Sequence, residues 1–122
     1  MEQPFSLTSD MRDNCLVITT SGYVNNVGGE AIAAEFNRYF EKGVRHVVIN
    51  LGGSRVVNSV GMSFLIEIIE HLEEADGKLV FSDLDPAVEK MLSIMGLFQY
   101  AGKEKTVDDA LAALGGAGKA GR

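Results

Sequence analysis

The chain has 122 residues, 46% of them hydrophobic, and its 11 basic and 17 acidic residues give a formal net charge of −6. The length and apolar content predict a single domain that buries its own core without disulfides. The acidic balance argues against nucleic acid as the main ligand, because phosphate binding requires clustered Lys and Arg, and it favours protein partners with basic or mixed surfaces.

The first residues predict a β-hairpin. Apolar and polar residues alternate over 5–9, turn formers occupy 10–14, and Cys15–Thr20 is apolar and β-branched, as expected of two antiparallel strands. Cys15 is the only cysteine, and we interpret it as a small buried hydrophobe, since a lone thiol makes neither an internal disulfide nor a thiolate metal cluster. Met1–Pro4 lack the regions of a signal peptide, and no apolar stretch reaches about 18 residues, so we expect a cytoplasmic protein without membrane insertion.

Helices and strands then alternate along the chain. Residues 22–29 indicate a glycine-rich loop, and a helix follows that Gly43 ends. Val47–Leu51 is a nearly continuous apolar run, which is typical of a central strand. The apolar residues at helical spacing in this first helix are Ile32, Phe36, Tyr39 and Phe40.

The alternation continues in the second half of the chain. A helix is expected from about Val60 to Ala75, Gly77 ends it, and Lys78–Ser82 predicts another strand. The expected core stripe of the helix comprises Leu65, Ile68, Ile69 and Leu72.

Two further helices are expected near the C-terminus. Asp85–Pro86 supplies an N-cap followed by Pro at the first helical position, and Gly96 closes that helix. Leu97–Tyr100 is expected either as a short edge strand or as irregular structure. Residues 106–109 resemble a capping box and open a last helix that ends near Leu114. The expected apolar face of the earlier helix comprises Val88, Leu92 and Met95.

These elements predict an α/β fold in the order β-β-α-β-α-β-α-α. Strands that alternate with helices pair in parallel through right-handed crossovers, whereas the initial hairpin is antiparallel, so the sheet is mixed. We expect about four to five strands and about four helices in a single domain over residues 1–114. The Gly- and Ala-rich residues 115–122 are expected to form a flexible tail.

The junction between the strand Val47–Leu51 and the helix after it carries the main candidate site. Asn58 and Ser59 begin that helix, and either side chain can accept hydrogen bonds from its free backbone N–H groups. The same N–H groups and the helix dipole favour an anion. A phosphate on Ser59 would therefore be tolerated and would change the surface charge by nearly two units. A simple helix cap is the better explanation of the motif taken alone, because such caps are common.

The order of motifs from about Phe5 to Leu114 resembles the STAS domain, the fold of bacterial anti-sigma factor antagonists. Asn58–Gly61 corresponds to the family's Asp-Ser-Ser-Gly segment, at the start of the helix that follows the central strand. The other matching positions are Gly22, Val47–Leu51, Asp85–Val88, Met95–Phe98 and Thr106–Ala112. The resemblance implies a STAS-like fold over most of the chain.

The same resemblance implies a phosphorylation switch. In the family, the first Ser of the motif, here Ser59, is phosphorylated by a partner serine kinase that is itself the anti-sigma factor, and a phosphatase resets the protein. The unphosphorylated antagonist binds the kinase and frees the sigma factor, and the phosphorylated form lets go. We therefore expect a regulator that is not an enzyme. Its expected partner-binding residues are Asn50, Arg55, Asn58, Val60, Gly61 and Ser63.

The chain departs from the family's pattern in its charges. Asn58 replaces the leading Asp of the motif, and Asn50 stands where the family often carries Asp at the end of the central strand. The fold should be retained, because Asn serves in helix caps and turns as Asp does. A kinase that binds at this site would contact two fewer carboxylates. Val60 replaces the second Ser and removes a competing hydroxyl. An alternative function is a scaffold or adaptor subunit in a signalling or transport complex, without phosphorylation.

Other polar residues give weaker hypotheses. Ser63 lies one turn after Ser59 and is a second acceptor, a partner contact or a small residue that lets another surface approach, and Ser54 is a weaker acceptor candidate. His46 and His71 lack the oriented nucleophile and third group of a catalytic site, so a small hydrolase or phosphatase has the least support. The Gly pairs and Asp residues match neither a P-loop nor a Ca²⁺ loop, and we expect no cofactor or metal.

The methionines and the residues just before Asn58 also suggest where apolar surface lies. Met62, Met91 and Met95 fall at helical spacing and are expected in the core, with an adaptable binding surface as the alternative. We expect Arg55 to be exposed, whereas Val56 and Val57 either form a docking patch or fold inward.

Overall fold

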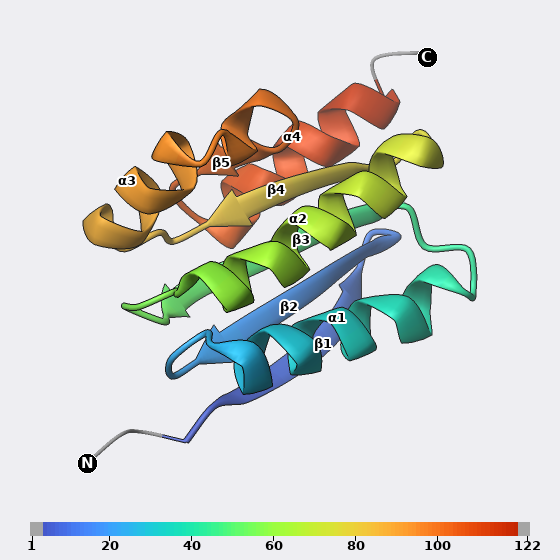
Figure 1. Cartoon of the computed structure of the whole chain (residues 1–122). Coiled ribbons are helices and arrows are strands. Elements are labelled where there is room, and N and C mark those ends of the chain that lie inside the picture. The colour runs from blue at the N-terminus through green and yellow to red at the C-terminus, as the bar shows by residue number, and fades with distance from the viewer. Residues whose placement is uncertain (1–3, 120–122) are drawn as a thin grey trace.

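A five-stranded mixed sheet organises the protein, and the computed structural model describes residues 4–119 (Figure 1). The strands lie in the order β1-β2-β3-β4-β5; β1 pairs with β2 antiparallel and the other pairs are parallel. This confirms the predicted α/β class, the initial hairpin and the central position of the third strand. The strands are β1 (Ser6–Arg12), β2 (Cys15–Ser21), β3 (His46–Gly53), β4 (Lys78–Ser82) and β5 (Gly102–Glu104).

Helices cover both faces of this sheet. In Figure 1, α1 and α2 cross one face side by side, α3 lies beside them, and α4 lies behind the sheet. Parallel pairing of β2, β3 and β4 requires crossover connections, which α1 and α2 supply. The helices are α1 (Asn26–Phe40), α2 (Ser59–Glu74), α3 (Pro86–Ile94), the 3₁₀ helix η1 (Leu97–Gln99) and α4 (Val107–Lys119).

The core has two parts, one on each face. The larger part packs the apolar stripes of α1 and α2 against β2, β3 and β4, and it includes Phe36, Leu65 and Phe81. The smaller part packs α4 on the opposite face of the same strands, where Cys15 lies with Val48 and Leu111. Cys15 is buried as predicted, and its desolvation, helped by nearby Asp13, raises the pKa of the thiol.

The hairpin between β1 and β2 is tighter than the sequence indicates. Arg12 pairs with Cys15, so only Asp13 and Asn14 form the turn, with φ angles of 53° and 67°. Positive φ at both central residues is the geometry of a type I′ turn, whose twist matches the flanking strands. Because residues 10–14 are rich in turn formers, the sequence did not predict that β1 continues to Arg12.

The expected loop over residues 22–29 is wrong at its end, because α1 already begins at Asn26. Asn25 caps this helix, and its Oδ1 accepts hydrogen bonds from the backbone N–H groups of Val27 and Gly28 at 3.0 and 3.1 Å. A Cβ on Gly29 would lie 2.6 Å from a ring carbon of Phe64 in α2. Gly29 therefore permits close packing of two helices and does not mark a loop.

The edge of the sheet also differs from the prediction. Leu97–Tyr100 is not a strand: Gly96 ends α3 with φ 84°, the 3₁₀ helix follows, and the edge strand is β5. Phe98 packs edge-on against Phe81, with ring centroids 6.2 Å apart. All side chains of β5 are exposed, so no apolar alternation signals this strand in the sequence.

The last helix is longer than expected. Thr106 Oγ1 accepts a hydrogen bond from the Asp109 N–H at 3.0 Å, as a capping residue should, but α4 continues past Leu114 to Lys119. Of the expected flexible tail, residues 120–122 lie outside the described part of the chain. Within the part described, no helix is both long enough and apolar enough to span a membrane.

Candidate functional site

The segment between β3 and α2 is fixed by hydrogen bonds to the residues that follow β2. Gly22 N–H donates to the Gly53 carbonyl at 2.9 Å, and Val24 N–H donates to the Val56 carbonyl at 3.0 Å. Asn58 N–H in turn donates to the Val24 carbonyl at 3.1 Å. Backbone hydrogen bonds on both sides of Val24 hold this segment in place, so the start of α2 has a defined position.

Asn58 is the N-cap of α2. Its Oδ1 accepts a hydrogen bond from the Gly61 N–H at 2.8 Å, which satisfies one of the unpaired donors in the first helical turn. The first turn of α2 contains no acidic side chain that would offset the partial positive charge there. The capping role that the sequence left open between two residues therefore belongs to Asn58.

Ser59 is the first residue of α2, and it is exposed. Within residues 4–119 its hydroxyl has no hydrogen-bond partner, since Asn58 already caps the helix. A free hydroxyl beside unpaired backbone N–H groups can receive a phosphate without breaking an existing contact.

Gly61 has a steric role next to this hydroxyl. A Cβ on Gly61 would lie 2.1 Å from the Val24 carbonyl oxygen and 2.8 Å from its carbon, both backbone atoms. Only glycine lets the first turn of α2 approach Val24 so closely. The glycine of the predicted motif thus helps to position Ser59, and it is itself buried.

Exposed apolar side chains lie on either side of Ser59 in the sequence. Val56 is 52% exposed and Val60 is 46% exposed, whereas Val57 is buried and pairs with Val24. Arg55 is exposed as expected. The segment from Arg55 to Val60 thus presents two apolar side chains and one cationic side chain at the surface on either side of this hydroxyl in the sequence.

The two other serine candidates differ sharply. Ser63 is exposed, and its hydroxyl donates to the Val60 carbonyl at 2.6 Å, one turn earlier in α2. Ser54 is fully buried and shares a 2.8 Å hydrogen bond with the Thr20 hydroxyl. The interpretation of Ser54 as an acceptor candidate is therefore wrong, because its hydroxyl cannot be reached from solvent.

Asn50 lies at the carboxyl end of the sheet. Its Oδ1 accepts a hydrogen bond from the Gly52 N–H at 2.8 Å, within the last residues of β3. A Cβ on Gly52 would lie 3.1 Å from the Cβ of Asp83, so Asp83 packs against the end of β3. Asp83 has a φ of 58°, and its Oδ2 is buried without a hydrogen-bond partner among the described residues. Sequence analysis missed Asp83, because it reads as an ordinary turn residue.

The remaining candidates do not join this site. His46 lies at the start of β3, and His71 lies late in α2, where its ring is 6.4 Å from that of Phe36. Among residues 4–119, no group of three or more His, Cys, Asp or Glu side chains could hold a metal ion. The three methionines were expected in the core. This prediction is confirmed for Met62, which is 2% exposed, but it is wrong for Met91 and Met95, which are 41% and 54% exposed.

The comparisons with known proteins agree with this architecture. The family model described as STAS domain matches residues 6–110. A protein of Bordetella bronchiseptica named as an anti-sigma factor antagonist, BtrV, is 32% identical over 90 residues, which cover 74% of this chain and 78% of that protein. Both the extent of the family match and this identity place the chain within one family.

Solved structures share the fold at lower identity. An anti-sigma factor antagonist from Mycobacterium paratuberculosis is 23% identical, with a TM-score of 0.81 over 93% of this chain and 98% of that one. SpoIIAA in its unphosphorylated form is 19% identical, with a TM-score of 0.78 over 91% and 97% of the two chains. The phosphorylated form of Bacillus SpoIIAA has a TM-score of 0.71 at 19% identity, over 88% and 98%. With a family match over residues 6–110 and a sheet arranged as in these structures, the chain belongs to the STAS domain family.

Proposed function

We propose that this protein is an anti-sigma factor antagonist that binds a partner serine kinase, itself the anti-sigma factor, and that phosphorylation of Ser59 switches this binding off. The observation that carries the proposal is the Ser59 hydroxyl, which is exposed at the start of α2 and has no partner within the described residues. The names of the relatives support the first half, and the solved phosphorylated form of SpoIIAA supports the second.

The surroundings of Ser59 suit a switch. Binding of a partner over Val56 and Val60 removes apolar surface from water, which stabilises the complex by roughly 25 cal/mol per Å². A phosphate between these side chains brings nearly two negative charges that the partner must desolvate. The phosphate also gains the helix N-terminus as a favourable neighbour in the free protein. Both effects favour dissociation of the phosphorylated form.

The charges near the acceptor differ from the family's pattern, and this bears on the choice of kinase. Asn50 and Asn58 carry amides that act in the fold as hydrogen-bond acceptors for backbone N–H groups. Asp83, which packs against Gly52 at the end of β3, retains one acidic side chain in this region. A kinase that phosphorylates Ser59 would therefore recognise mainly Arg55 and the exposed valines, with little help from acidic side chains.

The two amides also favour a second candidate, a STAS scaffold or adaptor subunit that binds its partner constitutively. In that case, Ser59 would serve only as a small exposed residue at the start of α2. The two candidates predict opposite effects of a negative charge at residue 59, because only the switch requires the charge to abolish binding.

The test begins with the chain purified from its own host and analysed by intact mass spectrometry and peptide mapping. We expect one phosphate, lost in Ser59→Ala and retained in Ser63→Ala, which removes the neighbouring hydroxyl as a matched control. A phosphate that persists in Ser59→Ala would contradict the assignment.

The second step measures binding of the purified partner kinase to the unphosphorylated wild type, Ser59→Ala, Ser59→Asp and the phosphorylated chain. We expect Ser59→Ala to bind as the wild type does, and Ser59→Asp to bind at least about tenfold more weakly, a loss of about 1.4 kcal/mol. Treatment of the phosphorylated chain with its resetting phosphatase should restore binding. Equal binding by all forms would support the constitutive adaptor and would overturn the switch.

A further inference from the structure

A second surface, far from Ser59, has the properties of a docking site. A groove of about 610 Å³ lies between the C-terminal half of α2 and η1, and we call it the α2–η1 groove. Ser59 and Glu73 lie at opposite ends of α2, about 20 Å apart at a rise of about 1.5 Å per residue. The residues that line the groove are Ile66, Ile69, Glu70, Glu73, Glu74, Met95, Gly96, Leu97 and Tyr100.

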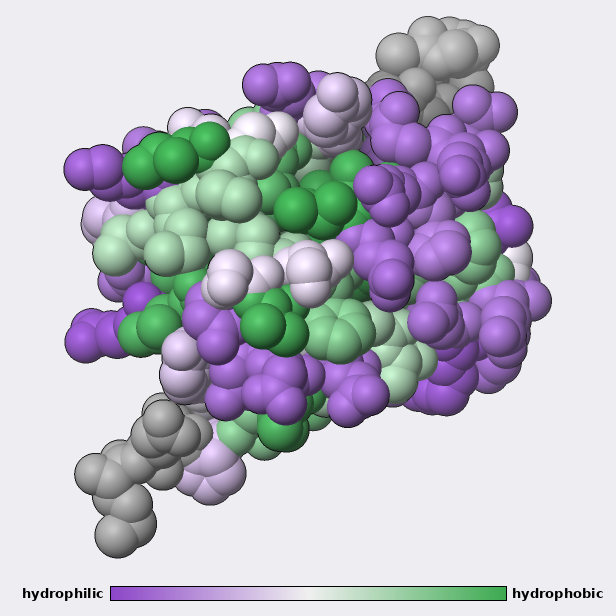
Figure 2. All heavy atoms as spheres, in the orientation of Figure 1, coloured by the Kyte–Doolittle hydropathy of each residue, from purple (hydrophilic) through white to green (hydrophobic). Residues whose placement is uncertain are grey.

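The groove has an apolar floor that continues onto α3. Ile69 and Leu97 are buried at its base, and Met95 and Tyr100 are 54% and 63% exposed at one wall. Ile94 on α3 is 72% exposed, and Met91, one turn earlier, is 41% exposed. Figure 2 shows apolar side chains gathered over α3 and the adjoining part of α2. Soluble proteins seldom expose adjacent large apolar side chains in this way unless another molecule covers them.

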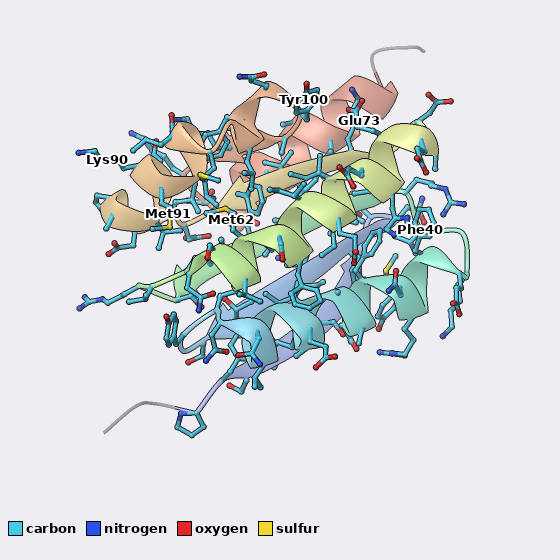
Figure 3. All side chains as sticks on the ribbon, viewed as in Figure 1. Phe40, Met62, Glu73, Lys90, Met91 and Tyr100 are labelled. Atoms are coloured by element: carbon cyan, nitrogen blue, oxygen red, sulfur yellow. The ribbon has the colours of Figure 1, made fainter. Side chains whose placement is uncertain are left out.

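The opposite wall of the groove is acidic. It carries Glu70, Glu73 and Glu74, and none of these carboxylates forms an ion pair within the described residues. In Figure 3, Glu73 and Tyr100 lie close together at this end of the molecule, whereas Lys90, in the middle of α3, lies well away from them. No basic side chain lines the groove, so its carboxylates repel one another and attract cations.

From this combination we propose that the α2–η1 groove binds a basic amphipathic helix of a partner protein. Apolar residues of that helix would cover Met95, Ile94 and Tyr100, and its Lys or Arg residues would pair with the three carboxylates. The groove is lined by α2, the end of α3 and η1, so it offers no strand edge for a partner to extend. Methionine side chains adapt their shape to an incoming helix.

Charge argues against two other occupants. In a symmetric dimer the same patch lies on both copies, so both surfaces would bring the same three unpaired carboxylates into the interface, and their repulsion opposes association. A membrane surface is also disfavoured, because the anionic lipids of the cytoplasmic leaflet repel carboxylates. A basic helix satisfies both the apolar floor and the acidic wall.

The test uses a fluorescently labelled model helix of about 18 residues, long enough to fold on binding, with Leu at i, i+3, i+4 and i+7 and Lys elsewhere. Binding to the full chain is followed by fluorescence anisotropy. We expect the peptide to bind more tightly than two controls: a scrambled peptide of the same composition and an amphipathic peptide with Glu in place of Lys. Equal binding of either control would overturn the proposal.

Variants of the chain then locate the site. We expect Glu73→Lys and Tyr100→Ala each to weaken binding about tenfold, because one reverses a charge of the acidic wall and the other removes a large aromatic side chain of the kind that contributes most at interfaces. Glu30→Lys, at an exposed position on α1, changes the net charge by the same amount as Glu73→Lys. It lies outside the groove, so it should leave the affinity unchanged. Thermal unfolding of each variant checks that the fold is intact.

Three outcomes would refute the site. Equal weakening by Glu30→Lys would mean that the peptide responds only to net charge. Unchanged affinity in both groove variants would place binding elsewhere. A chain that sediments as a dimer, and becomes a monomer in Tyr100→Ala, would assign the face to a second copy. Ser59→Asp should bind the peptide as the wild type does, so this experiment succeeds or fails independently of the proposed switch.

Discussion

The side chain of Asn58 hydrogen-bonds to the backbone N–H of Gly61, and this one contact at 2.8 Å leaves the adjacent hydroxyl of Ser59 unused. A serine that caps a helix through its own hydroxyl would exchange that contact for new ones on phosphorylation. Here the two tasks belong to different residues, so a modification at Ser59 can change the surface while the start of α2 stays in place.

The capping role of Asn58 predicts a clear order of stabilities. We expect Asn58→Ala to lower the free energy of unfolding by about 1 kcal/mol, because the Gly61 N–H loses its acceptor. Asn58→Asp keeps the acceptor and adds a charge that the helix N-terminus favours, so it should be at least as stable as the wild type. Urea unfolding followed by circular dichroism measures both changes, and an equal loss in the two variants would contradict the capping role.

A negative charge at residue 59 should stabilise the free protein. The first turn of α2 has no acidic side chain, so Ser59→Asp should raise the free energy of unfolding by about 0.3–1 kcal/mol at low ionic strength. The gain should shrink as salt is added, because exposed charges are screened. Ser63→Asp, beyond the first turn, serves as the control and should show little gain. A fall in stability for Ser59→Asp would mean that the helix terminus does not accommodate an anion.

The sequence was informative where one physical requirement determined a residue. The apolar run of β3 predicted a central strand, and the start of α2 required a side-chain acceptor for its free N–H groups. The junction between the two elements at Asn58 and Ser59 was therefore predictable. The hairpin and the Asp85 cap followed from turn and cap chemistry in the same way.

Residues whose role depends on distant neighbours were not predictable. Gly29 looks like a loop residue until α2 brings Phe64 against it, and Ser54 looks exposed until β2 brings Thr20 to its hydroxyl. Met95 matches the apolar face of α3, yet no element of the described chain covers it. Helical spacing shows which residues share a face, but it does not show whether that face is covered.

The close approach of Gly61 to Val24 predicts a large and local effect. In Gly61→Ala the new methyl would press on the Val24 carbonyl, and we expect a loss of about 1–3 kcal/mol, the usual cost of overpacking. Gly115→Ala is the matched control, because nothing lies within 4 Å of its Cβ position in α4, and helix propensity should raise stability by about 0.5–1 kcal/mol. Urea unfolding compares the two variants, and similar effects from both would show that Gly61 has no packing role.

Glu35 on α1 predicts a dependence of stability on pH. Its carboxylate accepts a hydrogen bond from Arg38 Nη2 at 2.9 Å and another from the Ser9 hydroxyl on β1. Both contacts lower the pKa of Glu35, and the contact with Arg38 has the larger effect. A carboxyl whose pKa is lower in the folded than in the unfolded chain stabilises the fold above its unfolded pKa, about 4.3. That stabilisation is lost as the pH falls through the lower pKa of the folded state.

We therefore expect Glu35→Gln to be less stable than the wild type at pH 7, because the amide cannot attract Arg38 as the carboxylate does. The difference should be constant down to about pH 5 and should then narrow as the wild-type carboxyl is protonated. Unfolding by urea at a series of pH values between 7 and 3 measures it. Glu30→Gln, on the same helix but at a side chain with no hydrogen bond or ion pair within the described residues, is the matched control for the loss of one charge on α1. A difference for Glu35→Gln that stays the same at every pH would mean that the loss comes from shape alone, and that the charge of Glu35 does not hold β1 against α1.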